Sequence, residues 1–341
     1  MKGIPILLQN LLLIVGAVSS FQPMTTQKFR KVSFLNQSES QPVDSTVLAD
    51  SFDTIVQSRY ACTRFHRHED SSNVSVKSSQ SNADIVKKAF HCLDLSRRAP
   101  SGFNAQPYRM ILVHTTSQKE LLANYCLGRN ADRVRDSDCT AVFLADKECL
   151  RDYKRFGSFL QKTARGRTTN KSKPLSPWAR RKIQGLVLLF SSGWPLPRFV
   201  ANPLSFCIRL GVSACSAITR RKLLVPSLAS AETWATKNTM LVAMTYMLAC
   251  SSRGIETCPM EGFNAGGIRK VLGIPRQYSI PLIVSTGLPY RREAEEEGED
   301  DVGMGHGSAL LKSDNASSRF PIDEAIFGDQ FGQAGVSNLS Q

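Results

Sequence analysis

One long apolar helix constrains the fold of this chain more than any other stretch. Residues 231–252, AETWATKNTMLVAMTYMLACSS, follow a helical pattern that is apolar around most of its circumference. Ser230 can cap the amino terminus of this helix, and Gly254 lies just beyond its carboxyl terminus. A helix that is apolar on most sides has to be enclosed by other elements, so the sequence predicts a central, buried helix.

Shorter elements precede and follow this helix. Apolar spacing predicts helices over 51–60, 84–95, 117–127 and 265–272, and strands over 110–114, 140–145 and 281–286. Ser117 and Glu120 have the spacing of a capping box. The stretch CPMEGFN, which starts at Cys258, reads as a turn. Without internal repeats, this mixture predicts one α+β domain over residues 51–328.

Charge is concentrated in one part of the chain. The 341 residues carry a formal net charge of +14, and residues 151–222 contain sixteen Lys or Arg and one acid. The rest of the chain is therefore close to neutral, and we expect no nucleic-acid partner. Hydrophobic content of 42% and charged content of 21% are typical of a soluble globular protein.

The basic stretch belongs to an insertion at about 151–228. Its second half is apolar but is broken by glycines and prolines, which argues against a transmembrane helix. Two interpretations remain open. The cations and Trp194 suit a helix pair that lies on an anionic membrane; alternatively, the apolar half packs as a lid over a binding site. An acidic, glycine-rich loop at about 292–308 is expected to be mobile.

The amino terminus, residues 1–50, has the pattern of a targeting leader. Lys2 precedes a short apolar run, and small residues come before Phe21, as in a secretory signal peptide. The stretch after Phe21 is basic and free of acids. This combination resembles the bipartite leader of algae with complex plastids, so we expect plastid import, with the secretory pathway as the alternative.

Several common kinds of site are not indicated. The nine cysteines contain no C-x-x-C pair and have no histidine at zinc spacing, so we expect free thiols and no metal. No G-x-G-x-x-G follows a predicted strand, and no Ser-His-Asp arrangement stands out.

The loop between the second predicted helix and the first strand is unusually rich in backbone-shaping and amide residues. Residues 96–109 read SRRAPSGFNAQPYR. A plain turn would explain its Pro and Gly. A ligand-holding loop would explain the same glycine together with a hydroxyl and two amide side chains. The loop alone does not separate these two interpretations.

Four spaced motifs together resemble the FMN-dependent nitroreductases. They are Arg59-Tyr60-Ala61-Cys62-Thr63-Arg64-Phe65, Ala99-Pro100-Ser101-Gly102-Phe103-Asn104-Ala105-Gln106-Pro107-Tyr108, the pair Asn130 and Arg133, and Pro259-Met260-Glu261-Gly262-Phe263; Arg319-Phe320-Pro321 fits a closing motif. No single motif is decisive, but their order and spacing are strong evidence. The resemblance spans roughly residues 52–328, without the insertion.

The resemblance implies a fold, a cofactor and a set of ligand contacts. The fold would be a central, mostly antiparallel sheet flanked by helices in an intertwined homodimer, with FMN at the interface. The implied FMN-binding residues are Arg59, Ala61, Thr63, Pro100, Ser101, Gly102, Asn104, Gln106, Asn130, Arg133, Pro259, Glu261, Gly262 and Arg319. Arg59, Thr63 and Arg319 suit the phosphate, and Arg319 would serve the partner's flavin. Two positions depart from the family pattern, because Ala61 replaces a serine and Thr63 replaces a base.

The implied activity is ping-pong hydride transfer from NAD(P)H to an electron-poor small molecule such as a nitroarene, quinone or flavin. The flavin would carry the chemistry, so no protein acid or base is named as catalytic. The alternatives are a lidded reductive dehalogenase, a flavin-processing member of the same fold, and a non-catalytic flavin-binding module docked on a membrane.

Overall fold

The computed structural model describes residues 45–66, 81–149 and 231–290, together with positions 207, 210, 211, 214, 217, 218, 319 and 325–327. Most of the predicted leader, nearly all of the insertion at 151–228 and the acidic loop at 292–308 lie outside these residues. The choice between lid and membrane element therefore also lies outside them. Among the described residues, no helix is both long enough and apolar enough to span a bilayer.

A four-stranded sheet forms the centre of the described part. Its strands are β1 (Tyr108–Val113), β2 (Cys139–Asp146), β3 (Glu256–Met260) and β4 (Tyr278–Gly287). They lie in the order β1-β2-β4-β3, and every neighbouring pair is antiparallel. The prediction of a central antiparallel sheet is confirmed, and β1 and β3 are its two edges within the described residues.

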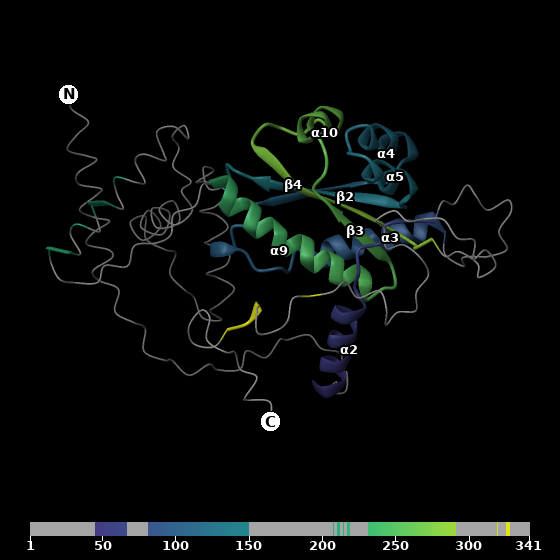
Figure 1. The fold of residues 1–341 in the computed structure, drawn as a ribbon, viewed down its shortest axis with the longest axis horizontal. Coiled ribbons are helices and arrows are strands. Elements are labelled where there is room, and N and C mark those ends of the chain that lie inside the picture. The colour runs from purple at the N-terminus through teal and green to yellow at the C-terminus, as the bar shows by residue number, and fades with distance from the viewer. Residues whose placement is uncertain are drawn as a thin grey trace, which may run out of the picture.

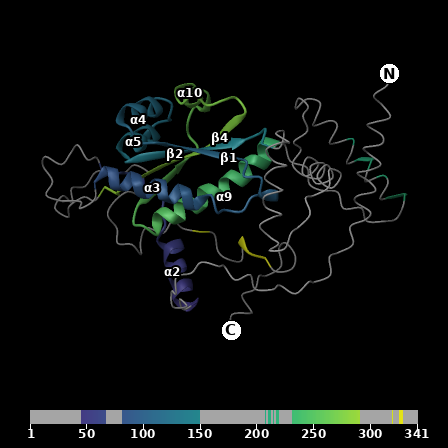
Figure 2. The ribbon, with the colours of Figure 1, turned by 180° about the vertical axis from the view of Figure 1, so that it is seen from behind.

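Helices cover both faces of this sheet. They are α2 (Ser45–Ser58), α3 (Asn82–Ser96), α4 (Thr116–Ala123), α5 (Arg129–Asp136), α9 (Ala231–Ser251) and α10 (Ala265–Val271). Figures 1 and 2 show α3 and α9 side by side on one face, and α4, α5 and α10 on the other. α2 projects away from the sheet near α9.

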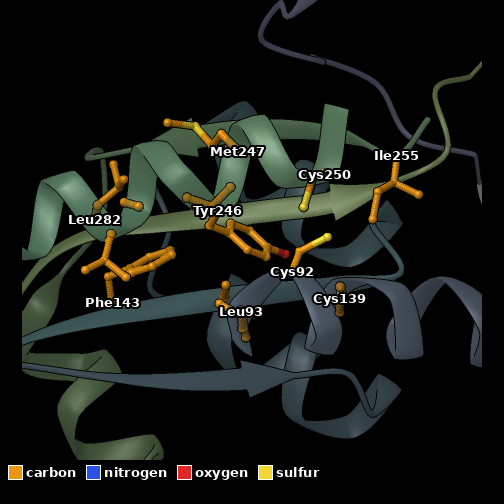
Figure 3. Packing of buried hydrophobic residues seen from close by; sticks show 14 of the residues in the cluster. Cys92, Leu93, Cys139, Phe143, Tyr246, Met247, Cys250, Ile255 and Leu282 are labelled. Carbon is orange, nitrogen blue, oxygen red and sulfur yellow. The ribbon is translucent and has the colours of Figure 1, made fainter. Parts of the chain in front are cut away.

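The larger core lies between the sheet and the helix pair α3 and α9 (Figure 3). Tyr246 of α9 is fully buried, its ring tilts against Phe143 of β2 at 5.8 Å between centroids, and its hydroxyl lies 2.8 Å from the hydroxyl of Thr286. The prediction of a central helix is thus confirmed. Leu241 and Met244 are exceptions, because they lie on an exposed side of α9.

The second core lies on the opposite face of the sheet. Val142 and Ile283 alternate with the residues of the first core along their strands, so that each strand contributes to both cores. Leu122 of α4, Val134 of α5 and Ile268 of α10 close this second core. Strands buried on both faces explain why the predicted strands read as continuous apolar runs.

Two predicted elements need correction. The helix expected at 117–127 begins at Thr116 and ends at Ala123, with Thr115 at the N-cap and no side-chain capping bond. Ser117 is therefore not the cap, and Glu120 instead pairs with Arg135 at 2.9 Å. The stretch expected to be a turn at Cys258 contains the end of strand β3. Its proline, Pro259, is compatible with a strand because β3 is at the edge of the sheet.

The segment 59–65 runs along the outer side of β3. Ala61 forms a parallel bridge with Thr257, and the Cys62 amide donates to the Thr257 carbonyl at 3.0 Å. Further on, Phe65 bridges Pro289. This short segment follows α2 and is fixed to the edge of the sheet through backbone hydrogen bonds.

Gly254, just after the end of α9, allows a test of how much a left-handed backbone conformation contributes to stability. Gly254 adopts φ +66°, and an added Cβ would meet nothing within 4 Å. Gly254→Ala is therefore expected to lower the free energy of unfolding by about 1 kcal/mol, through conformational cost alone. Urea denaturation would measure the change, and Gly254→Asn should recover part of the loss because asparagine tolerates this conformation. An unchanged midpoint for Gly254→Ala would contradict the expectation.

Candidate functional site at the β3 edge and the loop before β1

A hydrogen-bond network joins three of the four sequence motifs. The Arg133 guanidinium on α5 donates to the Thr63 carbonyl at 3.4 Å and to Asn130 Oδ1 at 2.7 Å. The Asn130 side-chain amide donates in turn to the Gly262 carbonyl at 3.1 Å. Three segments far apart in the sequence are thus held together by two side chains of one helix.

Gly262 leaves room for this close approach. A Cβ at this position would lie 2.7 Å from Asn130 Nδ2, a distance that real Cβ atoms essentially never show. The backbone around Gly262 is also fixed from the other side, because the Leu127 amide donates to its carbonyl at 3.0 Å. The glycine leaves room for the amide of Asn130 beside the backbone that follows β3.

The other predicted residues of this region surround the network. Arg59 and Thr63 are half-buried, and Ala61 is exposed beside the edge of β3. Pro259 is half-buried within β3, whereas Glu261 is exposed just beyond its end. The arrangement combines cations, amides and backbone groups, which suits an anionic, hydrogen-bonding ligand.

The neighbouring cysteines are not poised as nucleophiles. Burial raises the pKa of the Cys62 thiol to about 12 and also raises that of Cys258, although the Arg133 charge partly offsets the second effect. Both thiols therefore stay protonated near neutral pH. Among the described residues, no group of three or more His, Cys, Asp or Glu could hold a metal ion.

The fourth motif, the loop 99–107, is braced by the first half of α9. The Gly102 amide donates to Asn238 Oδ1 at 2.7 Å, and Asn238 Nδ2 donates to the Trp234 carbonyl at 2.7 Å. A Cβ on Gly102 would lie 3.1 Å from the Trp234 ring. This contact fixes the position of the loop against the helix.

Within the loop the backbone is held in an uncommon conformation. Asn104 and Gln106 have φ values of +53° and +49°, and the Ser101 hydroxyl accepts a hydrogen bond from the Gln106 amide at 3.0 Å. Non-glycine residues in this region are uncommon and often occur at functional sites. Pro100 and Asn104 are exposed, and Ser101 and Gln106 are half-buried.

The two halves of the predicted site lie apart within one chain. The loop 99–107 precedes β1, whereas the Arg133 network lies beside β3 at the opposite edge, three strand spacings or about 14 Å away. Along the strands, Tyr108 aligns with Ser279 through Ala145, and Met260, two residues before Gly262, aligns with Ile283. The loop and the Gly262 end of the network therefore lie toward the same end of the sheet, and they are separated across the strands. Arg319, in turn, is exposed and far from both in the sequence.

Two supporting residues were not predicted from the sequence. Asn238 is a buried amide of α9, and its neighbours Lys237 and Thr239 are also polar, so the sequence offered no contrast that would have singled it out. Lys119 of α4 is also buried, and its ammonium donates to the carbonyls of Arg135 at 3.1 Å and of Ser137 at the carboxyl end of α5. A cation is favourable at that end of a helix. Lys119 thereby fixes the helix that carries Asn130 and Arg133.

Comparison with known proteins identifies the family. The model of the nitroreductase family matches residues 83–288, which is more than half of the chain. The chain therefore belongs to the nitroreductase family, as its motifs predicted.

Individual relatives are more distant or match over shorter stretches. MhqN of Bacillus subtilis (strain 168), described as an NAD(P)H nitroreductase, is 36% identical over 53 residues, which cover 16% of this chain and 26% of MhqN. The chain thus aligns with about a quarter of the length of this curated relative.

Solved structures with a similar arrangement were also found. A nitroreductase family protein from Streptococcus pneumoniae TIGR4 is 18% identical and covers 81% of this chain and 98% of its own, with a TM-score of 0.46. A nitroreductase from Exiguobacterium sibiricum 255-15, solved in complex with FMN, is 17% identical and covers 74% and 93%, with a TM-score of 0.45.

Proposed function

We propose that this protein is an FMN-dependent oxidoreductase that uses NAD(P)H to reduce an electron-poor small molecule. The observation that supports this most directly is the network in which Arg133 and Asn130 join the Thr63 segment to Gly262. Family membership and the order of the four motifs support the same assignment.

The residues at the β3 edge fit FMN chemically. The phosphate is a dianion, and Arg59, with the hydroxyl of Thr63, would supply a cation and a donor for it. The flavin ring presents carbonyls and ring nitrogens, which would accept from the amide of Asn130 and the guanidinium of Arg133. The absence of a side chain at Gly262 would let the exposed backbone near Glu261 approach the ring closely.

The protein side of the reaction is binding and orientation. When bound, FMN supplies the two-electron hydride transfer between NAD(P)H and an acceptor. Arg133 would place positive charge at the ring, where it favours a reduced, electron-rich flavin. Asn130 holds the Arg133 guanidinium in position through a 2.7 Å hydrogen bond. We assign no catalytic acid or base among the described residues.

We further propose that two copies of the chain complete each site. The loop 99–107 and the Arg133 network lie at opposite edges of the sheet, and this separation within one chain supports the proposal. A second copy would bring its loop to the network of the first. The exposed apolar side chains Val47, Leu48 and Phe52 on α2 support an interface of this kind. Arg319 would then reach the flavin bound at the neighbour.

Mixing two defective variants tests both proposals. Gly102→Val should displace the loop because its side chain meets Trp234, and Arg133→Met should disable the network. Each variant alone should bind FMN at least about 10-fold more weakly than the unmodified protein, so the mixture is assayed at an FMN concentration that fills only intact sites. After unfolding and refolding together, random pairing should restore about one quarter of the sites, because one of the two sites in each heterodimer is intact.

FMN fluorescence quenching and NADPH consumption with an added quinone would measure this recovery. Circular dichroism of each variant controls for folding. Recovery of neither binding nor turnover would contradict a shared site. Full FMN binding without turnover would instead favour the non-catalytic flavin-binding module, and turnover of halogenated or flavin substrates would favour the specialised members of the fold. Plastid import and membrane docking through residues 151–228 remain separate proposals that rest on the leader and on the charge pattern.

A further inference from the structure

Two buried thiols lie together where α3 packs on the last turn of α9. Cys92 of α3 donates from its Sγ to the Ala249 carbonyl at 3.3 Å, and Ala249 precedes Cys250 in α9. Cys250 follows Ala249 directly in α9, so its side chain lies beside the residue that Cys92 contacts. Figure 3 shows their sulfur atoms turned toward one another beside the Tyr246 ring.

We propose that Cys92 and Cys250 are a redox site that forms a reversible disulfide between α3 and α9. A disulfide requires that the two backbones approach closely with the side chains facing each other, and the packing of α3 on α9, the Cys92–Ala249 contact and the facing sulfur atoms provide this arrangement. The proposed flavin chemistry has no role for these thiols, so this inference does not depend on the proposed function.

The surroundings make the two thiols unequal. The neighbouring Cys250 thiol lowers the pKa of Cys92, and the nearby Arg253 guanidinium lowers it further, against the effect of burial. Burial and the adjacent Cys92 sulfur hold the pKa of Cys250 well above its usual value. Arg253 is itself fixed by donating to the Ala249 carbonyl at 3.0 Å, the same carbonyl that Cys92 contacts. Because the Arg253 guanidinium and the Cys92 thiol contact the same carbonyl, the positive charge lies beside Cys92, which acts as the nucleophile, with Cys250 as the resolving thiol.

The oxidant is a peroxide, which is small enough to enter a buried site. The Cys92 thiolate attacks one peroxide oxygen, so that an S–O bond forms, the O–O bond breaks and hydroxide leaves. Cys250 then attacks the sulfur of the sulfenic acid, the S–S bond forms and the S–O bond breaks. Two thiols and one hydrogen peroxide thus give one disulfide and two waters. A dithiol reductant reverses the bond by exchange.

The position of the pair gives the bond a structural consequence. Cys92 lies one turn before the end of α3, which leads into the loop 99–107, and Cys250 lies just before the connection from α9 to β3. A bond between them would tie together the helices that lead to both halves of the candidate site. It would also close a long chain segment, which stabilises the folded state.

Peptide mapping of the purified, reduced full-length protein tests the proposal. After treatment with hydrogen peroxide, the protein is denatured in N-ethylmaleimide, digested and analysed by mass spectrometry. We expect a linked pair of peptides containing Cys92 and Cys250, lighter by two hydrogens and released by dithiothreitol. The oxidised protein should also melt at a higher temperature than the reduced one. This test needs neither flavin nor NAD(P)H.

Matched variants separate this pair from other thiols. Cys92→Ser and Cys250→Ser should abolish the link, whereas Cys139→Ser, in the same core, should retain it. Arg253→Gln should slow its formation without abolishing it. If Cys92→Ser or Cys250→Ser does not fold, the map of the unmodified protein still decides. Recovery of both cysteines as alkylated or singly oxidised residues after peroxide, or a link to any other cysteine, would overturn the proposal.

Discussion

Replacement of Arg133 by methionine is expected to weaken FMN binding by about 1.5–3 kcal/mol, the scale of a hydrogen bond to a charged group. That loss corresponds to about a 10- to 100-fold rise in Kd. The guanidinium contributes in two ways, because it would face the flavin and because it connects Thr63 to Asn130. Methionine keeps most of the side-chain volume and removes the charge. Titration of the apoprotein with FMN, followed by flavin fluorescence, measures the change.

Arg135 provides the matched control two residues further along α5. It forms ion pairs with Glu120 at 2.9 Å and with Asp132 at 3.3 Å, and both acids are well exposed. Exposed pairs of this kind contribute at most about 1 kcal/mol to stability. Arg135→Met should therefore change the unfolding midpoint slightly and leave FMN affinity intact. Equal losses of affinity in the two variants would show that helix stability, rather than the Arg133 contact, determines binding.

Tyr246→Ala is expected to have the largest effect on stability, about 3–5 kcal/mol in the free energy of unfolding. The side chain is fully buried between α9 and the sheet, and its ring packs against Phe143. Alanine would leave a cavity at the centre of the first core. Tyr246→Phe keeps the ring and removes only the hydrogen bond to Thr286, so it should cost about 1 kcal/mol. Denaturation in urea would separate the contribution of the ring from that of the hydroxyl. Equal losses of stability in Tyr246→Ala and Tyr246→Phe would contradict this division.

The same tyrosine predicts a direction for alkaline stability. Burial raises the pKa of Tyr246 well above its usual value. Above a pH of about 10, the unfolded chain releases this proton while the folded chain retains it, so stability falls as pH rises. Buried Cys139 and Cys250, whose pKa values are also raised, act in the same direction. Tyr246→Phe should lose stability less steeply above pH 10 than the unmodified protein, and parallel curves would contradict the assignment.

Strong periodicity made the helices near the first core predictable. The pattern at 84–95 corresponds to α3, and the apolar run from residue 231 corresponds to α9, because both helices pack one face against a core. The residues at which helices begin and end were harder to predict from the sequence. Thr115 and Ser117 are both suitable caps, and only tertiary contacts decide which one precedes the helix. Strand β3 was missed because Pro259 usually marks a turn, and the sequence does not reveal that this strand is at an edge.

The candidate site was predictable as a set of residues but not as an arrangement. The motifs named Asn130, Arg133 and Gly262, and the structure brings these three residues into one network. Nothing in their spacing indicated that the loop 99–107 lies at the opposite edge of the sheet. That separation follows from strand order, which depends on long-range pairing. The contact of Gly102 with Asn238 depends in the same way on how the loop packs on α9.

The bridge between Ala61 and Thr257 has a consequence for where the folded unit begins. β3 is an edge strand, and an uncovered edge presents unpaired backbone groups that can recruit strands from other molecules. The Cys62 amide occupies part of that edge by donating to the Thr257 carbonyl, and Phe65 continues the segment by bridging Pro289 just after β4. A chain shortened to the region matched by the family model, which starts at residue 83, would lose this cover. A protein that resists aggregation therefore has to include residues before position 83, where the match to the family model begins.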